Sequence, residues 1–185
     1  MNDPEHIDWG SWGGAFSKDK KASIRSMSAV KNEKDYDPYY MYGDCAEKES
    51  SVSRWAEAYQ NDFLARMIWS VTDSYEDANH HPHAVLNQDT TMDILSISAK
   101  TGETVSLTAD GSSDPDGDAL EYSWYVYRVE GTYSKEVAIS GRDSIDAKIS
   151  VPEDAAGSSI HVILEICDSS SPKLYAYRRI IINVE

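Results

Sequence analysis

Residues 110–118 hold the densest group of potential ligand atoms in the sequence, and they read Asp-Gly-Ser-Ser-Asp-Pro-Asp-Gly-Asp. Asp114, Asp116 and Asp118 stand at alternate positions, and the glycines and the proline around them favour a tight loop. Calcium takes six to eight oxygen ligands, and closely spaced carboxylates on one loop can supply several of them. The chemistry that this spacing first indicates is therefore the binding of a hard cation.

The same loop has a second interpretation, because Asp side chains in Asp-Pro-Asp-Gly segments also bond to nearby backbone amides and cap a turn. An EF-hand is excluded, since that pattern needs Gly at the sixth position and Glu at the twelfth, where this chain has Ala119 and Tyr125. In a sandwich fold the loop would lie near the connection between the last two strands, where Asp168 could add a ligand. Two readings stay open: a capped turn, or a calcium site made of Asp114, Asp116, Asp118 and Asp168.

Aromatic residues gather near the N-terminus and form a second candidate binding group. They are Trp9, Trp12, Tyr39, Tyr40 and Tyr42. Aromatic rings can stack on the apolar faces of sugar rings, so an exposed group of them can bind a glycan such as cellulose. The alternative is that these rings cover a core or pack against the helix that follows them.

The sequence offers little support for catalysis or for a zinc site. Glycoside hydrolysis needs two carboxylates across a cleft, and no carboxylate in this chain is marked out by an apolar setting. His80, His81 and His83 lie close together, but no cysteine is nearby and a linker is a poor frame for ligands, so a solvated linker is favoured. We therefore expect no catalytic residue and no enzymatic activity.

The composition limits the classes of partner. The chain has 185 residues and a net charge of −15, from 17 basic and 32 acidic side chains. This excess argues against binding to nucleic acids or to anionic membranes, both of which need a basic surface. No run approaches the ~18 apolar residues of a membrane helix, and the polar N-terminus does not read as a signal peptide.

One strong helical pattern occupies residues 53–71. Ala56, Tyr59, Phe63, Met67 and Val71 recur at three- and four-residue spacing. Ser53 precedes them as the expected N-cap. Further apolar residues widen this surface beyond one stripe, so we expect the helix to dock tightly on its neighbours or to form a dimer.

After a polar linker the hydrophobic period changes from helical to two. Apolar and polar residues alternate around 105–109, 120–126, 145–151, 160–166 and 175–184, after a weaker start at Val85 and at 94–97. Turn sequences separate these runs, which is typical of a sandwich. The sequence predicts a mainly β protein with an immunoglobulin-like antiparallel β-sandwich, Trp124 in its core, and an irregular and helical segment before it.

Motifs in the sandwich region resemble those of known modules. Gly111–Asp118, followed by a strand with Tyr122 and Trp124, is similar to polycystic-kidney-disease-like (PKD-like) and cadherin-like domains. A closer resemblance covers nearly the whole chain and is carried by segments 9–14, 54–63, 65–67, 78–80, 84–87 and 160–165. Together they resemble the bacterial secreted "cellulose-binding protein" family, which has a nucleoside-hydrolase-like N-terminal domain and an immunoglobulin-like C-terminal domain.

The resemblance implies a domain plan. Residues 1–75 would correspond to the end of the nucleoside-hydrolase-like domain, 76–82 to a linker, and 83–185 to the immunoglobulin/PKD-like sandwich. The aspartate-rich strand end that holds calcium and ribose in that family has no counterpart here. Ala15 also stands where the family has a basic residue, which removes support for a ligand contact there.

The resemblance also implies a function. A non-catalytic accessory or binding module of a secreted carbohydrate-related protein is expected, outside the cell or in the periplasm. Its expected partners are a polysaccharide such as cellulose and the nucleoside-hydrolase-like domain. Two alternatives stay open: a C-terminal fragment of a hydrolase whose catalytic half is missing, and a calcium-stabilised adhesion-like module.

Overall fold

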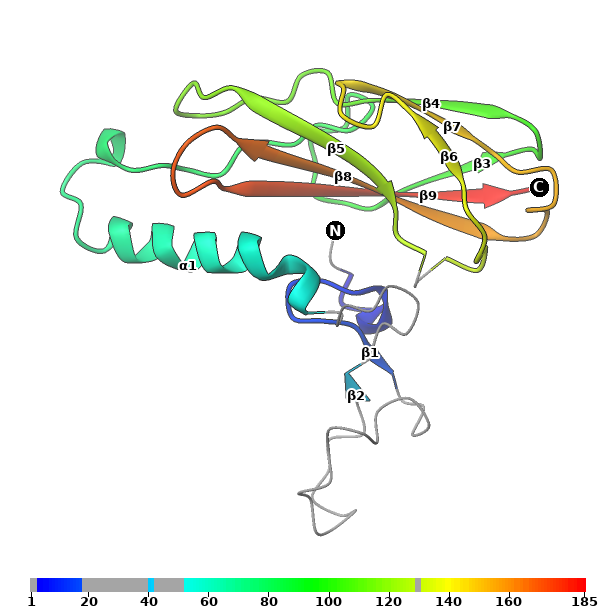
Figure 1. The fold of residues 1–185 in the computed structure, drawn as a ribbon, viewed down its shortest axis with the longest axis horizontal. Coiled ribbons are helices and arrows are strands. Elements are labelled where there is room, and N and C mark those ends of the chain that lie inside the picture. The colour runs from blue at the N-terminus through cyan, green and yellow to red at the C-terminus, as the bar shows by residue number, and fades with distance from the viewer. Residues whose placement is uncertain (1–2, 18–39, 42–51, 129–130) are drawn as a thin grey trace, which may run out of the picture. The chain divides into compact units, whose positions relative to one another are not determined.

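The structure is a computed structural model that describes residues 3–17, 40–41, 52–128 and 131–185. The chain divides into two compact units, Asn2–Glu57 and Ala58–Glu185. The boundary falls near the start of the long helix, so most of this helix belongs to the same unit as the sandwich (Figure 1).

Short elements make up the described part of the first unit. They include a 3₁₀ helix, η1 (Ile7–Trp9), and two short strands, β1 (Phe16–Ser17) and β2 (Tyr40–Met41), which pair antiparallel. Gly10 and Gly14 have φ angles of 72° and 94°. These conformations favour glycine, which explains why glycines accompany the tryptophans in this segment.

The predicted helix is present, with different ends. A 3₁₀ turn, η4 (Ser53–Trp55), leads into α1 (Ala56–Trp69). Ser53 therefore lies inside the turn instead of capping it, and the capping position is held by Val52, whose side chain makes no capping hydrogen bond. A further 3₁₀ helix, η5 (Tyr75–Asp77), follows. Among the described residues no helix has the length and apolar character needed to cross a membrane.

Two sheets form the second unit (Figure 1). The larger has the strand order β3 (Leu95–Ala99), β9 (Tyr175–Val184), β8 (Ser159–Asp168) and β5 (Leu120–Val126). The smaller has the order β4 (Thr104–Thr108), β7 (Asp146–Ser150) and β6 (Ala138–Ser140). The prediction of a mainly β sandwich is confirmed.

One strand pair departs from the antiparallel prediction. β3 pairs with β9 in parallel, from Leu95 opposite Ile180 to Ala99 opposite Val184, whereas the other pairs of the two sheets are antiparallel. A hairpin forces two strands to run in opposite directions, but β3 and β9 are separated by the rest of the sandwich. The alternating pattern in the sequence contains no signal for the direction of such a distant pair.

The core lies between the sheets and is built from the alternating apolar positions. Val105 and Leu107 of β4, Ile149 of β7 and Leu164 of β8 are buried around Trp124. The Trp124 side chain is 1% exposed, and its Nε1 donates a hydrogen bond of 2.8 Å to the carbonyl oxygen of Ser144. Trp124 thus occupies the predicted core position, with its polar atom satisfied.

Candidate functional site

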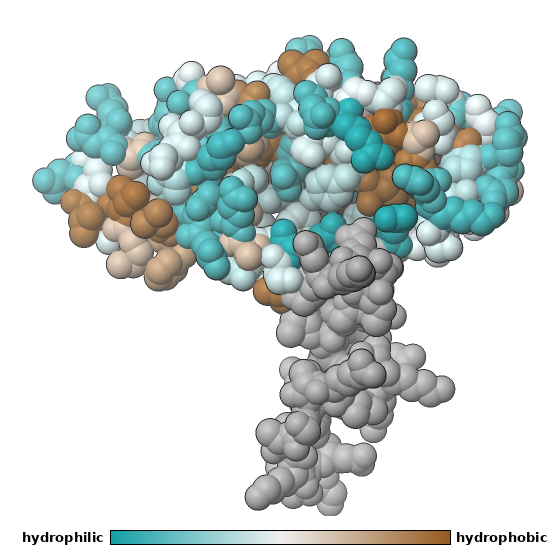
Figure 2. Space-filling view, viewed as in Figure 1, coloured by the Kyte–Doolittle hydropathy of each residue, from teal (hydrophilic) through white to brown (hydrophobic). Residues whose placement is uncertain are grey.

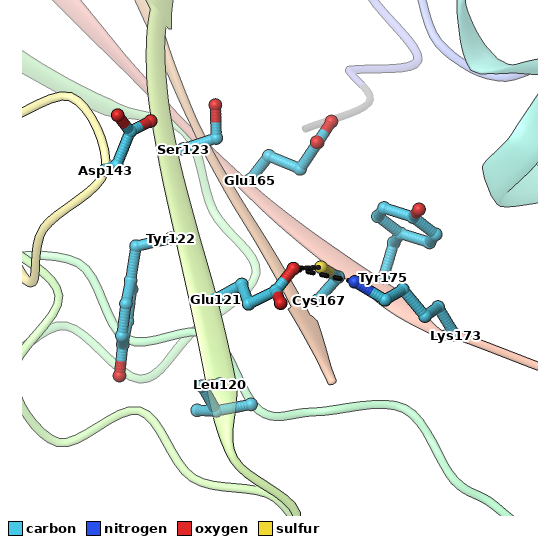
Figure 3. A pocket seen from close by; sticks show the side chains of 9 residues that line it. All are labelled: Leu120, Glu121, Tyr122, Ser123, Asp143, Glu165, Cys167, Lys173 and Tyr175. Carbon is cyan, nitrogen blue, oxygen red and sulfur yellow. Dashed lines mark hydrogen bonds and ion pairs between the residues drawn. The ribbon is translucent and has the colours of Figure 1, made fainter. Parts of the chain in front are cut away.

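A pocket of about 550 Å³ surrounds β5, the end strand of the four-stranded sheet (Figure 3). Its wall is formed by side chains on both faces of β5, by side chains of β8 and β9, and by the β6–β7 and β8–β9 loops. The lining residues are Leu120, Glu121, Tyr122, Ser123, Asp143, Glu165, Cys167, Lys173 and Tyr175.

Strand register brings the polar half of this lining together. Glu121 of β5 stands opposite Cys167 of β8, which in turn stands opposite Tyr175 of β9. The next row on the same face contains Glu165, whose partners on the two neighbouring strands are Ser123 and Tyr177. Side chains two residues apart point to the same face of a sheet, so both rows open toward one side.

Glu121 is the centre of the bonded groups in the pocket. Its Oε2 accepts a hydrogen bond from Nζ of Lys173 at 2.7 Å and one from Sγ of Cys167 at 3.5 Å (Figure 3). The bond from Lys173 lowers the pKa of the Glu121 carboxyl, which favours its ionised form. Burial, together with the nearby Glu121, raises the pKa of the Cys167 thiol to about 12.

The remaining polar groups make the pocket acidic. Asp143 reaches it from the β6–β7 loop, and Glu165 accepts a hydrogen bond of 3.4 Å from the hydroxyl of Tyr125. With Glu121 this gives three carboxylates against a single lysine. The Tyr175 ring lies nearly parallel to that of Tyr177, with ring centroids 6.3 Å apart and an interplanar angle of 11°.

This arrangement can bind a neutral polyhydroxylated molecule. Carboxylates accept hydrogen bonds from hydroxyl groups, lysine donates to them, and a tyrosine ring offers a flat apolar face. The lowered pKa of Glu121 makes that carboxyl a poor general acid, since a general acid in glycoside hydrolysis needs a raised pKa.

The acidic loop lies between β4 and β5, as predicted, and it is a capped turn. Oδ1 of Asp114 accepts hydrogen bonds from the backbone N–H groups of Asp116 at 2.8 Å and of Asp118 at 3.2 Å. Each of these three residues also has a carboxylate oxygen within 4.8 Å of the others. Oδ2 of Asp114 is buried and has no hydrogen-bond partner among the described residues. Clustered carboxylate oxygens are the donor type that calcium prefers, so the three residues fit that ion in chemistry.

Asp168 does not join the three carboxylates. It is fully buried, and its Oδ1 accepts the backbone N–H of Ser170 at 3.1 Å. Its Oδ2 accepts the backbone N–H of Leu174 at 3.1 Å and Nδ2 of Asn79 at 2.9 Å. The structure thus uses Asp168 to fix the β8–β9 loop and to hold the linker.

The segment that follows α1 is docked, which corrects the expectation of a solvated linker. His80 bonds to Asp116 through its backbone N–H at 2.7 Å and its Nδ1 at 2.9 Å. His81 lies between α1 and β9, with Nε2 2.8 Å from Oδ1 of Asp62 and Nδ1 2.9 Å from the carbonyl oxygen of Tyr175. Both carboxylates lie outside the local sequence of the histidines, so no local pattern predicts these contacts.

The predicted aromatic group is only partly described. Trp9 and Trp12 are both half-buried, and the Trp9 ring stacks on His6 with centroids 3.9 Å apart. Tyr40 lies in β2, whereas Tyr39 and Tyr42 fall outside the described residues. Glycan binding by this group stays a prediction.

Sequence reasoning missed the pocket around β5. Most of its members are polar or aromatic residues on β5, β8 and β9, and two more lie on loops. Nothing in their local sequence separates them from other outward positions. The available signal was alternation: Glu121, Glu165 and Tyr175 all point away from the core. Only the register of β5, β8 and β9 shows that they lie together.

Comparisons with known proteins agree with this fold. Residues 104–184 match the family model of the cellulose-binding protein Sde0182, C-terminal domain. Over its whole length the chain is similar to the structure of a nucleoside hydrolase-related hypothetical protein from Saccharophagus degradans that is associated with carbohydrate metabolism, with 46% sequence identity and a TM-score of 0.85. The chain covers 44% of that protein, which is less than half of its length.

Other likenesses are weaker. The PKD domain of the KIAA 1837 protein has 15% identity and a TM-score of 0.37, with 58% of this chain and 92% of that domain covered. Protocadherin gamma B2 extracellular cadherin domains 3–6 have 17% identity and the same TM-score, with 56% and 25% covered. Both TM-scores are too low to support an inference about this chain. The search of the curated proteins found no match. Residues 104–184 of this chain, less than half of its length, are therefore similar to the C-terminal domain of the cellulose-binding protein Sde0182.

Proposed function

We propose that this chain is a non-catalytic accessory module that binds a glycan, with cellulose as the first candidate, in a secreted carbohydrate-related protein that acts outside the cytoplasm. The observation that carries the proposal is the pocket around β5, which lies within a domain whose family is described as cellulose-binding. The description of the Saccharophagus protein as associated with carbohydrate metabolism is consistent with it.

The pocket offers three kinds of group that could hold a sugar. The Tyr175 ring offers a stacking face, and Glu121 and Glu165 offer hydrogen-bond acceptors for hydroxyl groups. Lys173 is held beside Glu121 by a bond of 2.7 Å, so it keeps donors at a fixed position in the pocket. Because a glucan is neutral, the acidic pocket would hold it through hydrogen bonds and stacking, and binding should depend weakly on salt.

A depletion assay on insoluble cellulose tests this proposal. The purified chain is incubated with microcrystalline cellulose, and the protein that remains in solution is measured over a range of cellulose concentrations. Loss of stacking in Tyr175→Ala should weaken binding by about tenfold, within the 1–3 kcal/mol typical of an aromatic contact at a binding site. Met92→Ala is the matched control, because Met92 is an exposed apolar residue outside the pocket.

A second pair of variants compares the two candidate surfaces. Trp9→Ala and Trp12→Ala remove indoles of the predicted N-terminal aromatic group and leave the pocket intact. If these variants lose binding and Tyr175→Ala keeps it, glycan binding remains the function, but the binding site is the N-terminal aromatic group and not the pocket. If the unmodified chain is not depleted by cellulose and shows no heat of binding to soluble gluco-oligosaccharides, the proposed function is wrong.

A further inference from the structure

An apolar stripe on α1 is exposed to solvent. Phe63 is 67% exposed, Leu64 49%, Met67 53%, and Val71, in the turn that follows α1, is 80% exposed. Figure 2 shows hydrophobic surface gathered over the part of the molecule where Figure 1 places α1. Clustered exposed side chains of this size usually mark a surface that binds another protein element.

The stripe occupies one side of the helix. Successive residues of an α-helix are about 100° apart around its axis, so Phe63, Leu64 and Met67 fall within an arc of about 100°. Val71 continues the four-residue spacing of Phe63 and Met67. These four side chains are called here the α1 stripe: three share one side of the helix, and Val71 follows them in the turn.

The opposite side of α1 is already anchored. Asp62, Ala65 and Trp69 fall in an arc of about 60° that faces away from the α1 stripe. Ala65 is 1% exposed, Oδ1 of Asp62 lies 2.8 Å from Nε2 of His81, and Nε1 of Trp69 donates to the carbonyl oxygen of Asn79 at 2.7 Å. Rotation of α1 to bury the stripe on the sandwich would break these contacts, so the stripe needs a different partner.

A second copy of the chain is a poor partner through this stripe alone. An α-helix of 14 residues is about 21 Å long, and one face of it offers only a few hundred Å². Stable complexes of separate chains bury about 1,200–2,000 Å² in total. Two copies, each with a net charge of −15, would also repel one another.

A linked domain does not face the same limit. A covalent connection raises the effective concentration of the partner to roughly the millimolar range, so a small interface is enough. Interfaces between domains of one chain are often as small as about 600 Å². The Saccharophagus protein matches all of this chain at a TM-score of 0.85, yet the chain covers only 44% of it.

We propose that the α1 stripe is the docking surface for a further folded domain of the same polypeptide, corresponding to the part of the Saccharophagus protein that lies outside the match. The domain would offer an apolar groove that receives Phe63, Met67 and Val71 as anchors at helical spacing. This proposal does not rest on glycan binding.

Thiol labelling of two introduced cysteines tests the proposal. Met67→Cys lies on the stripe, and Met92→Cys, at a position 70% exposed, is the control. Each is made in this chain and in a chimera in which this chain replaces the matching part of the Saccharophagus protein. Labelling at pH 8 is followed by mass spectrometry of the peptide that contains the introduced cysteine.

The proposal expects Met67→Cys to label at least tenfold more slowly in the chimera than in the chain alone, with Met92→Cys unchanged. Equal rates in the two proteins would overturn it. If the labelling rate of Met67→Cys falls as the concentration of the free chain rises, a second copy of the chain covers the stripe. Slow labelling in the dilute free chain would assign it to another segment of this chain. Phe63→Cys supplies a second position if the Met67→Cys chimera melts at a lower temperature than the parent chimera.

Discussion

Cys167 has a thiol whose environment suppresses its reactivity. Burial, with the hydrogen bond to Glu121 and the charge of that carboxylate, raises its pKa to about 12, and Lys173 opposes the shift. At pH 8 an ordinary thiol with a pKa of about 8.5 is about one quarter thiolate, whereas a thiol with a pKa of about 12 is about two-thousandfold less ionised. Since the thiolate is the nucleophile, Cys167 should be nearly inert toward alkylating reagents in the folded protein.

The prediction for Cys167 is measured by the rate of iodoacetamide labelling in a Cys45→Ser variant, which removes the other cysteine of the sequence. The rate should rise about tenfold per pH unit between pH 8 and pH 10, because the thiolate fraction rises with pH below the pKa. Glu121→Gln should increase the rate at pH 8, since it removes a negative charge that raises the pKa. Labelling as fast as that of a Met92→Cys control at pH 8 would contradict a half-buried thiol with a raised pKa.

Calcium binding by the acidic loop stays a prediction that a melting experiment can decide. A ligand that binds only the folded state at about 100 times its Kd stabilises that state by about 2.7 kcal/mol, which is a rise in Tm of about 5–10 °C for a chain of this size. Asp114→Asn keeps the Oδ1 acceptor of the turn and removes the charge, so it should abolish the rise without unfolding the loop. Magnesium at equal ionic strength is the control. If Tm is identical in calcium and in chelator, the loop binds no calcium and acts only as a capped turn.

At the scale of elements, the sequence predicted what depends on local pattern. Alternation located β4, β5, β7, β8 and β9, and helical spacing located α1. The alternating pattern missed β6, which has only three residues, and it wrongly suggested that a strand starts at Val85. The direction of β3, the docked linker and the pocket depend on contacts between distant residues, such as Asn79 with Asp168, which no local pattern contains.

The buried carboxylate of Asp168 joins two elements, and its removal should cost stability. Asp168→Ala would leave the N–H groups of Ser170 and Leu174 without their acceptor, and the amide of Asn79 with one of its two acceptors. An unsatisfied buried donor costs about 1–3 kcal/mol, so we expect the free energy of unfolding to fall by about 3 kcal/mol. Urea denaturation monitored by tryptophan fluorescence measures it.

Asn79→Ala provides the comparison for Asp168→Ala. It removes the donor to Asp168 and the one to the carbonyl oxygen of Pro172, but it leaves the loop bonds of Asp168 in place. Its effect should be about half as large. If both variants unfold at the same urea concentration as the unmodified chain, the linker is not held to the sandwich by this carboxylate.

At the scale of the whole molecule, the charge of −15 should make stability depend on salt. The local ion pairs, such as Arg66 with Asp62 and Lys173 with Glu121, are partly exposed, and pairs of this kind contribute little each. With 32 acidic against 17 basic side chains, repulsion outweighs them in the folded state. The Debye length falls from about 30 Å at 0.01 M salt to about 10 Å at 0.1 M, which removes most of the long-range repulsion.

We therefore expect Tm at pH 7 to rise by a few degrees between 10 mM and 300 mM NaCl, measured by circular dichroism with a chelator present to exclude divalent cations. The same comparison at pH 5 should give a smaller rise, because the sequence pI is about 4.6 and the net charge is then close to zero. A rise that is equal at both pH values would point to a general salt effect on apolar burial instead of charge repulsion. A fall in Tm at pH 7 would mean that the local ion pairs, and not the excess of acidic groups, dominate the electrostatics of the fold.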